Sequence, residues 1–159
     1  MNPVVLNVDD NLDDVLLLRR ACRRAESQFD VHFVEDGELA IDYLLGRGEY
    51  KDRVKHPLPT LILLDLKMPR KTGFEVLAWL RANAEFRNIP VAIFSSSTNS
   101  DDIRRAMDTG ADCYLAKPLD YETLIALMRR LNDVLLGGTE ISKALARLPE
   151  RCVSVEGPQ

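Results

Sequence analysis

The chain has 159 residues, enough for one compact domain with a small appendage but too few for a second folded domain. Hydrophobic residues make up 46% of it and charged residues 29%, a balance that excludes a largely disordered chain. The formal net charge of -4 argues against a general nucleic-acid binder, which needs clustered Lys and Arg to neutralise phosphates. No apolar run approaches the roughly 18 residues of a membrane span and no basic leader is present, so we expect a cytoplasmic protein that does not contact membranes.

Short apolar runs alternate along the chain with longer segments of helical periodicity. Most of these runs lack polar alternation, as expected of strands that are covered on both faces. The alternation is typical of βαβ units, so we predict an α/β fold with a parallel five-stranded sheet. The predicted strands are Val4–Val8, Val31–Val34, Leu61–Leu64, Val91–Phe94 and Cys113–Ala116.

Five helices are predicted between and after these strands. The first places Val15 and Leu18 on one apolar stripe, and the second ends at Gly46. The third opens at Thr72 with Glu75 three residues further on, which is the spacing of a capping box.

The last two helices differ in apolar content. The fourth, from about 100 to 109, is weakly apolar and stops at Gly110, whereas the fifth carries a strong apolar stripe up to Leu135. We therefore expect a domain at 1–136 and a C-terminal extension at 137–159, made of a short helix and a flexible tail. The residues that favour the short helix are Ile141, Leu145 and Leu148.

The cysteines and histidines show no pattern of a site. Cys22, Cys113 and Cys152 have neither disulfide nor metal-ligand spacing. Cys22 and Cys113 stand among apolar residues and are expected to be buried thiols, which fits a reducing cytosol. His32 and His56 are isolated, so we predict no phosphohistidine site.

Polar side chains follow four of the predicted strands: Asp9 and Asp10, then Asp65, then Ser95, then Lys117. Because the carboxyl ends of parallel strands lie at one edge of a sheet, we expect these side chains to converge. Clustered carboxylates repel one another unless a cation neutralises them, and Mg2+ prefers such oxygen ligands. An ammonium and a hydroxyl would complement the oxygens of a phosphoryl group. The pattern predicts Mg2+-dependent phosphoryl transfer to a carboxylate.

Each of these residues also has an ordinary structural explanation. Asp9 and Asp10 precede a helix, where acids favour the helix dipole. Asp65 reads as a turn residue, the hydroxyl run at 95–98 as a polar loop and Lys117 as a solvated lysine. Independent structural causes would have to coincide at four strand ends in order, and this coincidence favours the functional interpretation.

Four motifs surround these strand ends: Val8-Asp9-Asp10-Asn11, Leu63 to Pro69 with Gly73, Ile89-Pro90-Val91 through Ser95, and Gly110 to Pro118. In combination they resemble the response-regulator receiver family of two-component signalling, in its CheY-like, single-domain form. The resemblance covers roughly residues 3–136. It implies a flavodoxin-like (βα)5 three-layer sandwich with strand order 2-1-3-4-5. It also implies a stand-alone phosphorylation switch, not an enzyme that turns over a substrate. The output of this switch would pass through a partner protein.

By this resemblance, Asp65 accepts a phosphoryl group from a sensor histidine kinase, and Lys117 and Ser95 contact that group. Ser95 and Tyr114 would form the switch that changes an output surface on the fourth helix, fifth strand and fifth helix. The Lys117-Pro118 bond is expected to be cis. The implied Mg2+ ligands are Asp9, Asp10, Asp65 and the Lys67 carbonyl.

Two features differ from commoner receivers. Lys67 and Ser97 flank the site, and we expect them to modulate the lifetime of the phosphoryl group by altering the access of water. The run at 43–50 is similar to single-domain regulators partnered with bacterial phytochromes. A phytochrome is therefore an expected kinase, and an ordinary histidine kinase is the alternative.

Other classes of protein share parts of this pattern. A phosphatase of the haloacid dehalogenase type also phosphorylates an aspartate beside Mg2+, but it needs a second acid where this chain has Lys67. A flavodoxin-like FMN-binding module should carry a phosphate loop after the first strand, where this chain has Asp9 and Asp10. A dinucleotide enzyme is disfavoured because the glycine pair at 46–48 follows a helix.

Two surface features leave the partners open. The arginines at 19–24 suit an acidic kinase face, although most such helical charge runs are simply solvated. The apolar stripe of the fifth helix suits either a homodimer or packing on the sheet.

Overall fold

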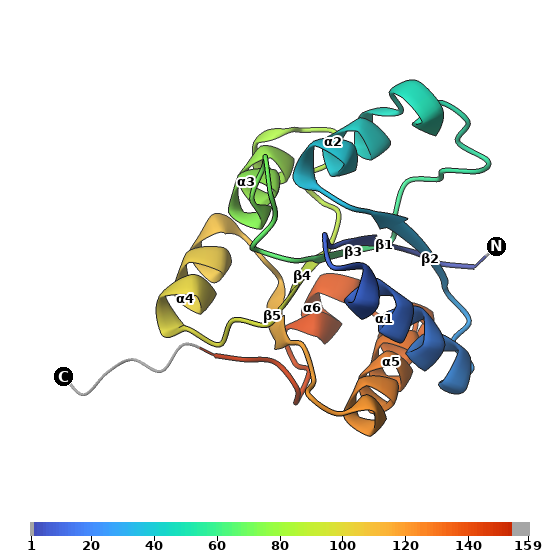
Figure 1. Ribbon diagram of the computed structural model, residues 1–159, viewed down its shortest axis with the longest axis vertical. Helices are drawn as coiled ribbons and strands as arrows, with labels where there is room; N and C mark the ends of the chain where they lie inside the picture. Colours follow the sequence, from blue (N-terminus) through green and yellow to red (C-terminus); the bar gives the residue numbers. More distant parts are fainter. Residues whose placement is uncertain (1, 154–159) are drawn as a thin grey trace.

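The computed structural model describes residues 2–153. Five parallel strands form one sheet in the order β2-β1-β3-β4-β5, which confirms the predicted α/β fold and its strand order (Figure 1). Two strands are one residue longer than predicted, β2 at its start and β4 at its end. The strands are β1 (Val4–Val8), β2 (Asp30–Val34), β3 (Leu61–Leu64), β4 (Val91–Ser95) and β5 (Cys113–Ala116).

Helices cover both faces of the sheet, with α2, α3 and α4 on one face and α1, α5 and α6 on the other (Figure 1). Within residues 2–153, none of them combines the length and apolarity needed to cross a membrane. The helices are α1 (Leu12–Arg24), α2 (Gly37–Leu45), the short 3-10 helix η1 (Gly48–Tyr50), α3 (Gly73–Ala82), α4 (Ser100–Thr109), α5 (Tyr121–Leu136) and α6 (Ile141–Leu145).

Local side chains define where several helices begin and end. The Thr72 hydroxyl accepts a hydrogen bond from the Glu75 N–H at 3.3 Å, as the capping-box spacing predicts. Asp36 caps α2 in the same way. The fourth helix stops at Gly110, whose φ of 116° lies in the left-handed region that favours glycine.

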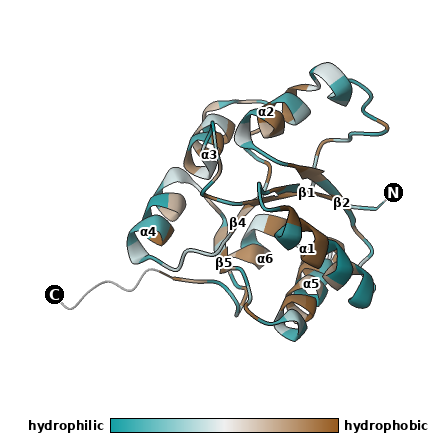
Figure 2. Ribbon diagram, viewed as in Figure 1, coloured by the Kyte–Doolittle hydropathy of each residue, from teal (hydrophilic) through white to brown (hydrophobic). Residues whose placement is uncertain are grey.

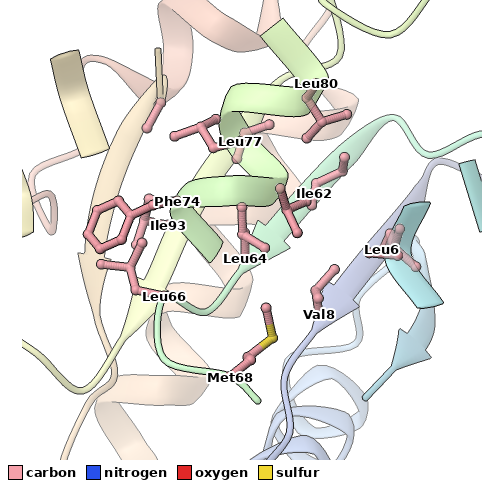
Figure 3. Close-up of a cluster of buried hydrophobic side chains, with 14 of the residues drawn as sticks. Leu6, Val8, Ile62, Leu64, Leu66, Met68, Phe74, Leu77, Leu80 and Ile93 are labelled. Atoms are coloured by element: carbon pink, nitrogen blue, oxygen red, sulfur yellow. The ribbon is translucent and has the colours of Figure 1, made fainter. Parts of the chain in front are cut away.

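Each face of the sheet has its own apolar core, because β1, β3 and β4 are buried along their whole length. Figure 2 shows largely hydrophobic strands beside helices that carry both colours. Figure 3 shows the core beneath α3, where Leu64, Leu77 and Ile93 pack together. Cys22 and Cys113 lie in the other core, and their burial raises the pKa of Cys22 to about 11 and that of Cys113 to about 12. Because the cores exclude water, polar side chains on the central strands concentrate at the strand ends.

The apolar stripe of α5 is used in packing on the sheet. Its residues are buried against β strands and α1, and Leu136 at its end is 44% exposed. Packing on the sheet therefore accounts for this stripe without a second copy of the chain. The buried residues of the stripe include Leu124, Leu127, Leu131 and Leu135.

The segment after α2 is held against that helix by one arginine. The Arg53 guanidinium donates hydrogen bonds to the carbonyls of Tyr43 at 2.7 Å and Leu44 at 2.6 Å. These carbonyls lie in the last turn of α2, where helical partners are missing. The Tyr43 hydroxyl reaches further and donates to the Pro57 carbonyl at 2.8 Å. The segment at 46–59, which we call the insertion, is thus an ordered part of the domain.

Four aromatic rings fill the space under this insertion. Five pairs of these rings have centroids between 5.2 and 6.4 Å apart, mostly edge to face. The rings belong to His32 of β2, Tyr43 of α2, Tyr50 of η1 and His56 of the following loop.

This ring cluster predicts acid sensitivity. Burial lowers the pKa of His32 below its usual 6.5, and the neighbouring His56 lowers it further. Below pH 6.5 the unfolded chain therefore binds protons more readily than the folded chain, so acidification favours unfolding. We expect the wild-type melting temperature to fall between about pH 7.5 and about pH 5.5 by more than that of His32→Gln, measured by circular dichroism. Parallel pH profiles for the two proteins would contradict this.

The C-terminal extension packs on the domain. Leu145 of α6 and the following Leu148 are buried in the core on the α1 and α5 face. Further on, Arg151 forms an antiparallel bridge with Leu115 of β5. The flexible tail predicted at the end of the extension, at residues 156–159, lies outside the described residues.

Candidate functional site

Three carboxylates meet where β1 and β3 end. Asp9 and Asp10 follow β1, and Asp65 follows β3, with the Asp65 N–H donating to the Val8 carbonyl at 3.0 Å. This parallel pairing holds the two strand ends level. Each residue places one carboxylate oxygen within 4.8 Å of the others. Asp9 and Asp65 are buried, whereas Asp10 is exposed at the rim, so the group forms a shallow acidic site open to solvent.

Lys117, at the end of β5, reaches into this acidic group. Its ammonium lies 2.8 Å from Asp9, 2.9 Å from Asp14 and 3.0 Å from Asp65. Only 11% of the Lys117 side chain is exposed. Burial acts to lower its pKa, but the hydrogen bonds to Asp14 and Asp9 and the charge of Asp65 outweigh burial and raise the pKa above its usual 10.5. Lys117 therefore carries its positive charge at neutral pH.

Burial also acts on the Asp9 carboxyl. Removal from water raises its pKa above the usual 3.8, and the hydrogen bonds from Lys117 and from the Asn11 N–H oppose that rise. The Asn11 contact is 2.9 Å long. Further positive charge at the strand ends would therefore stabilise the ionised form of Asp9.

Asp14 was missed as a member of this site. It lies in the first turn of α1, where the helix dipole alone favours an acid, so the sequence did not mark it as a site residue. The Asn11 side chain caps that turn by accepting from the Asp14 N–H at 3.2 Å, and the Asp14 carboxylate meets Lys117. No local signal marked this contact, because Lys117 is 103 residues away in the chain.

Asp65 is held by its own loop and by α3. Its Oδ1 accepts a hydrogen bond from the Leu66 N–H at 2.7 Å, and its Oδ2 faces Lys117. The N-terminus of α3 presses on this loop, because the Gly73 N–H donates to the Leu66 carbonyl at 2.9 Å. A Cβ on Gly73 would lie 2.1 Å from the Asp65 carbonyl oxygen, so only glycine allows this approach.

The end of β4 contributes hydroxyls. Ser95 is buried, and its Oγ accepts from the Ser97 N–H at 3.2 Å. Ser97 in turn donates its hydroxyl to Asp102 of α4 at 2.7 Å. The ring of Tyr114 is fully buried, and its hydroxyl donates to the Ser97 carbonyl at 2.8 Å. The loop after β4 is therefore tied to both α4 and β5.

The remaining predicted residues lie around the same opening. Lys67 has an exposed side chain, and it lines one open hollow together with Asp10, Asp65, Ser97 and Lys117. The structure thus brings the predicted site residues of β1, β3, β4 and β5 to one edge of the sheet.

One expectation from the resemblance was wrong. Residues 2–153 contain no cis peptide bond, so the Lys117-Pro118 bond is trans. Trans is the intrinsic preference of a bond before proline, by about 0.5–1 kcal/mol.

The chain matches the family model of the response regulator receiver domain over residues 5–129. It is 32% identical to the response regulator Rcp1 of Synechocystis over 130 residues. The aligned region covers 82% of this chain and 86% of Rcp1. It is 35% identical over 135 residues to the probable methanogenesis regulatory protein FilR2 of Methanothrix harundinacea, covering 84% of each chain.

Solved structures agree with this match. The phosphorylated cyanobacterial phytochrome response regulator RcpA is 32% identical with a TM-score of 0.78, covering 88% of this chain and 98% of RcpA. RPA3017, a response regulator in red light signalling of R. palustris, is 34% identical with a TM-score of 0.81, covering 87% and 96%. The Mn2+-bound form of Rcp1 is 30% identical with a TM-score of 0.75, covering 87% and 97%. With its fold, its acidic group and these relatives, the chain belongs to the response regulator receiver family of two-component signalling.

Proposed function

We propose that this receiver domain is a stand-alone response regulator in which Asp65 accepts the phosphoryl group. The observation that carries the proposal is the buried Asp65 carboxylate, which faces the Lys117 ammonium at 3.0 Å beside two further acids. A carboxylate oxygen of Asp65 attacks the phosphorus of a phosphohistidine on a sensor kinase, and the bond from phosphorus to the imidazole nitrogen breaks. Lys117 and the Ser95 hydroxyl then contact the phosphoryl oxygens.

The residues present suit a divalent cation. The Lys117 ammonium meets three carboxylates, so its single positive charge leaves an excess of negative charge at the strand ends. Hard oxygen donors that reach solvent are the ligand set of Mg2+. When bound, Mg2+ would neutralise charge between these acids and an incoming phosphoryl group. The residues that would hold it are Asp9, Asp10, Asp65 and the carbonyl of Lys67.

The same contacts support a switch made by Ser95 and Tyr114. The Ser95 Oγ accepts from the Ser97 N–H in this arrangement, and a rotation of the Ser95 side chain that brings its O–H to a phosphoryl oxygen would move Oγ away from that N–H. Tyr114 holds the same loop through the Ser97 carbonyl. A charge change at Asp65 would bias these contacts between two arrangements. Lys67 and Ser97, at the rim of the hollow, would control the water that removes the phosphoryl group.

Exposed leucines beside the site support docking of a kinase. They lie on α1 and in the loop after β5, on either side of the acidic group, and are 42% to 106% exposed. Leucines rimmed by charged residues fit the pattern of a protein interface. The arginines of α1 extend this surface toward an acidic partner. The leucines are Leu12, Leu16, Leu17 and Leu119.

A bacterial phytochrome is the kinase that we propose, and an ordinary histidine kinase is the alternative. Support comes from the similarity to RcpA, a phytochrome response regulator, and to RPA3017, which acts in red light signalling, and from the ordered segment after α2. We also propose that the receiver unit is 1–136, that 137–159 is an extension, and that the protein works in the cytoplasm on a downstream protein target.

The test is phosphorylation of the purified protein by acetyl phosphate. We expect one phosphoryl group per chain by intact mass in the presence of Mg2+, and background incorporation when EDTA removes the metal. Peptide mapping should place the group on Asp65. Incorporation independent of Mg2+, or confined to another residue, would contradict the proposal. Sustained release of phosphate from a generic phosphoester would favour the phosphatase instead, and transfer from a phytochrome should differ between its two light states.

A further inference from the structure

The last described residues cross the edge of the sheet. We call residues 149–153 the strap. The Cys152 N–H donates to the Tyr114 carbonyl at 2.7 Å, and Arg151 forms an antiparallel bridge with Leu115. In Figure 1 the strap continues from α6 past β5. Since β5 is an edge strand, the strap covers main-chain groups that would otherwise face solvent.

The strap follows a firmly attached segment. Leu145 and Leu148, which precede it, are 0% and 5% exposed in the core of the α1 and α5 face. The strap itself is mostly exposed, and Cys152 is half-buried against the core that contains Tyr114. Leu148 is therefore the point from which the strap can pivot.

Few contacts hold the strap against the domain. They are the main-chain hydrogen bond and the partial burial of Cys152, and the exposed ion pair between Arg130 and Glu150 at 3.1 Å. The Arg151 guanidinium also donates to the Leu148 carbonyl at 2.8 Å. Within residues 2–153 the buried Oε2 of Glu150 has no hydrogen-bond partner, which opposes closure of the strap. A segment with so few buried contacts opens more readily than the core.

The strap is anchored on the predicted switch residue. Tyr114 is held at two ends: its hydroxyl binds the Ser97 carbonyl near Asp65, and its own carbonyl binds Cys152 of the strap. Ser97 is in turn bound to the hydroxyl of Ser95. A continuous set of contacts therefore joins the phosphoryl site to the strap.

On the basis of the proposed function, we propose that the strap is an autoinhibitory cover that occupies the β5 edge until phosphorylation of Asp65 releases it. When the Ser95 side chain rotates so that its hydroxyl donates to the phosphoryl group, its Oγ moves away from the Ser97 N–H. The Ser97 carbonyl then shifts, Tyr114 loses its support at the hydroxyl end, and the β5 backbone no longer matches the strap. Release leaves the Tyr114 and Leu115 main chain free only in the phosphorylated protein.

Cys152 provides a built-in reporter for this release. Cys22 and Cys113 are buried with raised pKa values, so a maleimide at about pH 8 should react mainly with Cys152. We expect labelling of Cys152 in the full chain, followed by peptide mass spectrometry, to be about fivefold faster or more after phosphorylation with Mg2+ and acetyl phosphate. Intact mass on the same sample gives the phosphorylated fraction. An unphosphorylatable Asp65→Asn control should show no increase, and Leu148→Asp should give the rate of a released strap.

The outcomes separate the two proposals. Full phosphorylation with an unchanged or slower labelling rate would overturn the autoinhibitory strap and leave the proposed function standing, with the strap acting only as edge protection. A wild-type protein that does not become phosphorylated would overturn the proposed function and the release that rests on it. Faster labelling in Asp65→Asn under the same conditions would show an effect of the reagent and would also overturn the release.

Discussion

Replacing Asp65 with asparagine is expected to reduce phosphoryl incorporation from acetyl phosphate to background. An amide is a poor nucleophile and cannot form the acyl phosphate, and the substitution also removes one of the three clustered carboxylates. The neighbouring Asp9 and Asp10 are not expected to replace it, since both are proposed to hold the Mg2+ on which incorporation depends. The measurement is intact-mass spectrometry over a time course with Mg2+.

Asp30→Asn is the matched control. Asp30 is an exposed acid at the start of β2, at the opposite edge of the sheet, and its replacement causes the same change in charge. Wild-type labelling is expected in this variant. Circular dichroism should show that both variants are folded. Stable labelling of Asp65→Asn at the wild-type level would refute the assignment of the acceptor.

The second large effect is on stability, at Gly73. Gly73→Ala is expected to lower the free energy of unfolding by roughly 3 kcal/mol, near the upper end for overpacking. The added Cβ would lie 2.1 Å from the Asp65 carbonyl oxygen and 2.7 Å from the Leu66 Cα, and both are backbone atoms that cannot rotate away. Relief requires α3 or the loop after β3 to move, so phosphorylation should also slow.

Gly48→Ala is the control that distinguishes the cost of steric crowding from the cost of a strained backbone conformation. Gly48 has a φ of +59°, and a Cβ there would meet nothing within 4 Å. Its replacement should cost only the left-handed conformation of a non-glycine residue, about 1–2 kcal/mol. Urea unfolding followed by circular dichroism compares the two variants. Equal midpoints for Gly73→Ala and Gly48→Ala would show that the loop after β3 moves easily to admit the added Cβ. That result would contradict a costly close approach at Gly73.

Features set by short stretches of chain could be predicted from the sequence. Apolar runs such as Leu61–Leu64 identify buried parallel strands, because a strand covered on both faces leaves no position for a polar side chain. The acid after that run then lies at the carboxyl edge of the sheet, together with Asp9 and Asp10. Capping residues in the sequence likewise predicted the start of α3 and the end of α4.

Contacts between segments distant in the chain were decided only by the tertiary structure. Asp14 joins Lys117 across 103 residues because α1 packs beside the end of β5, which no local pattern of acids reveals. The same kind of long-range packing brings the ring of His32 against His56 of the insertion. It also brings the strap to the Tyr114 carbonyl. The sequence by itself thus determined the strands, the helices and the edge at which the acids gather, since these follow from local periodicity. The tertiary structure decided which groups share the lysine, how the insertion is held and what covers the sheet edge, because those depend on how completed elements pack.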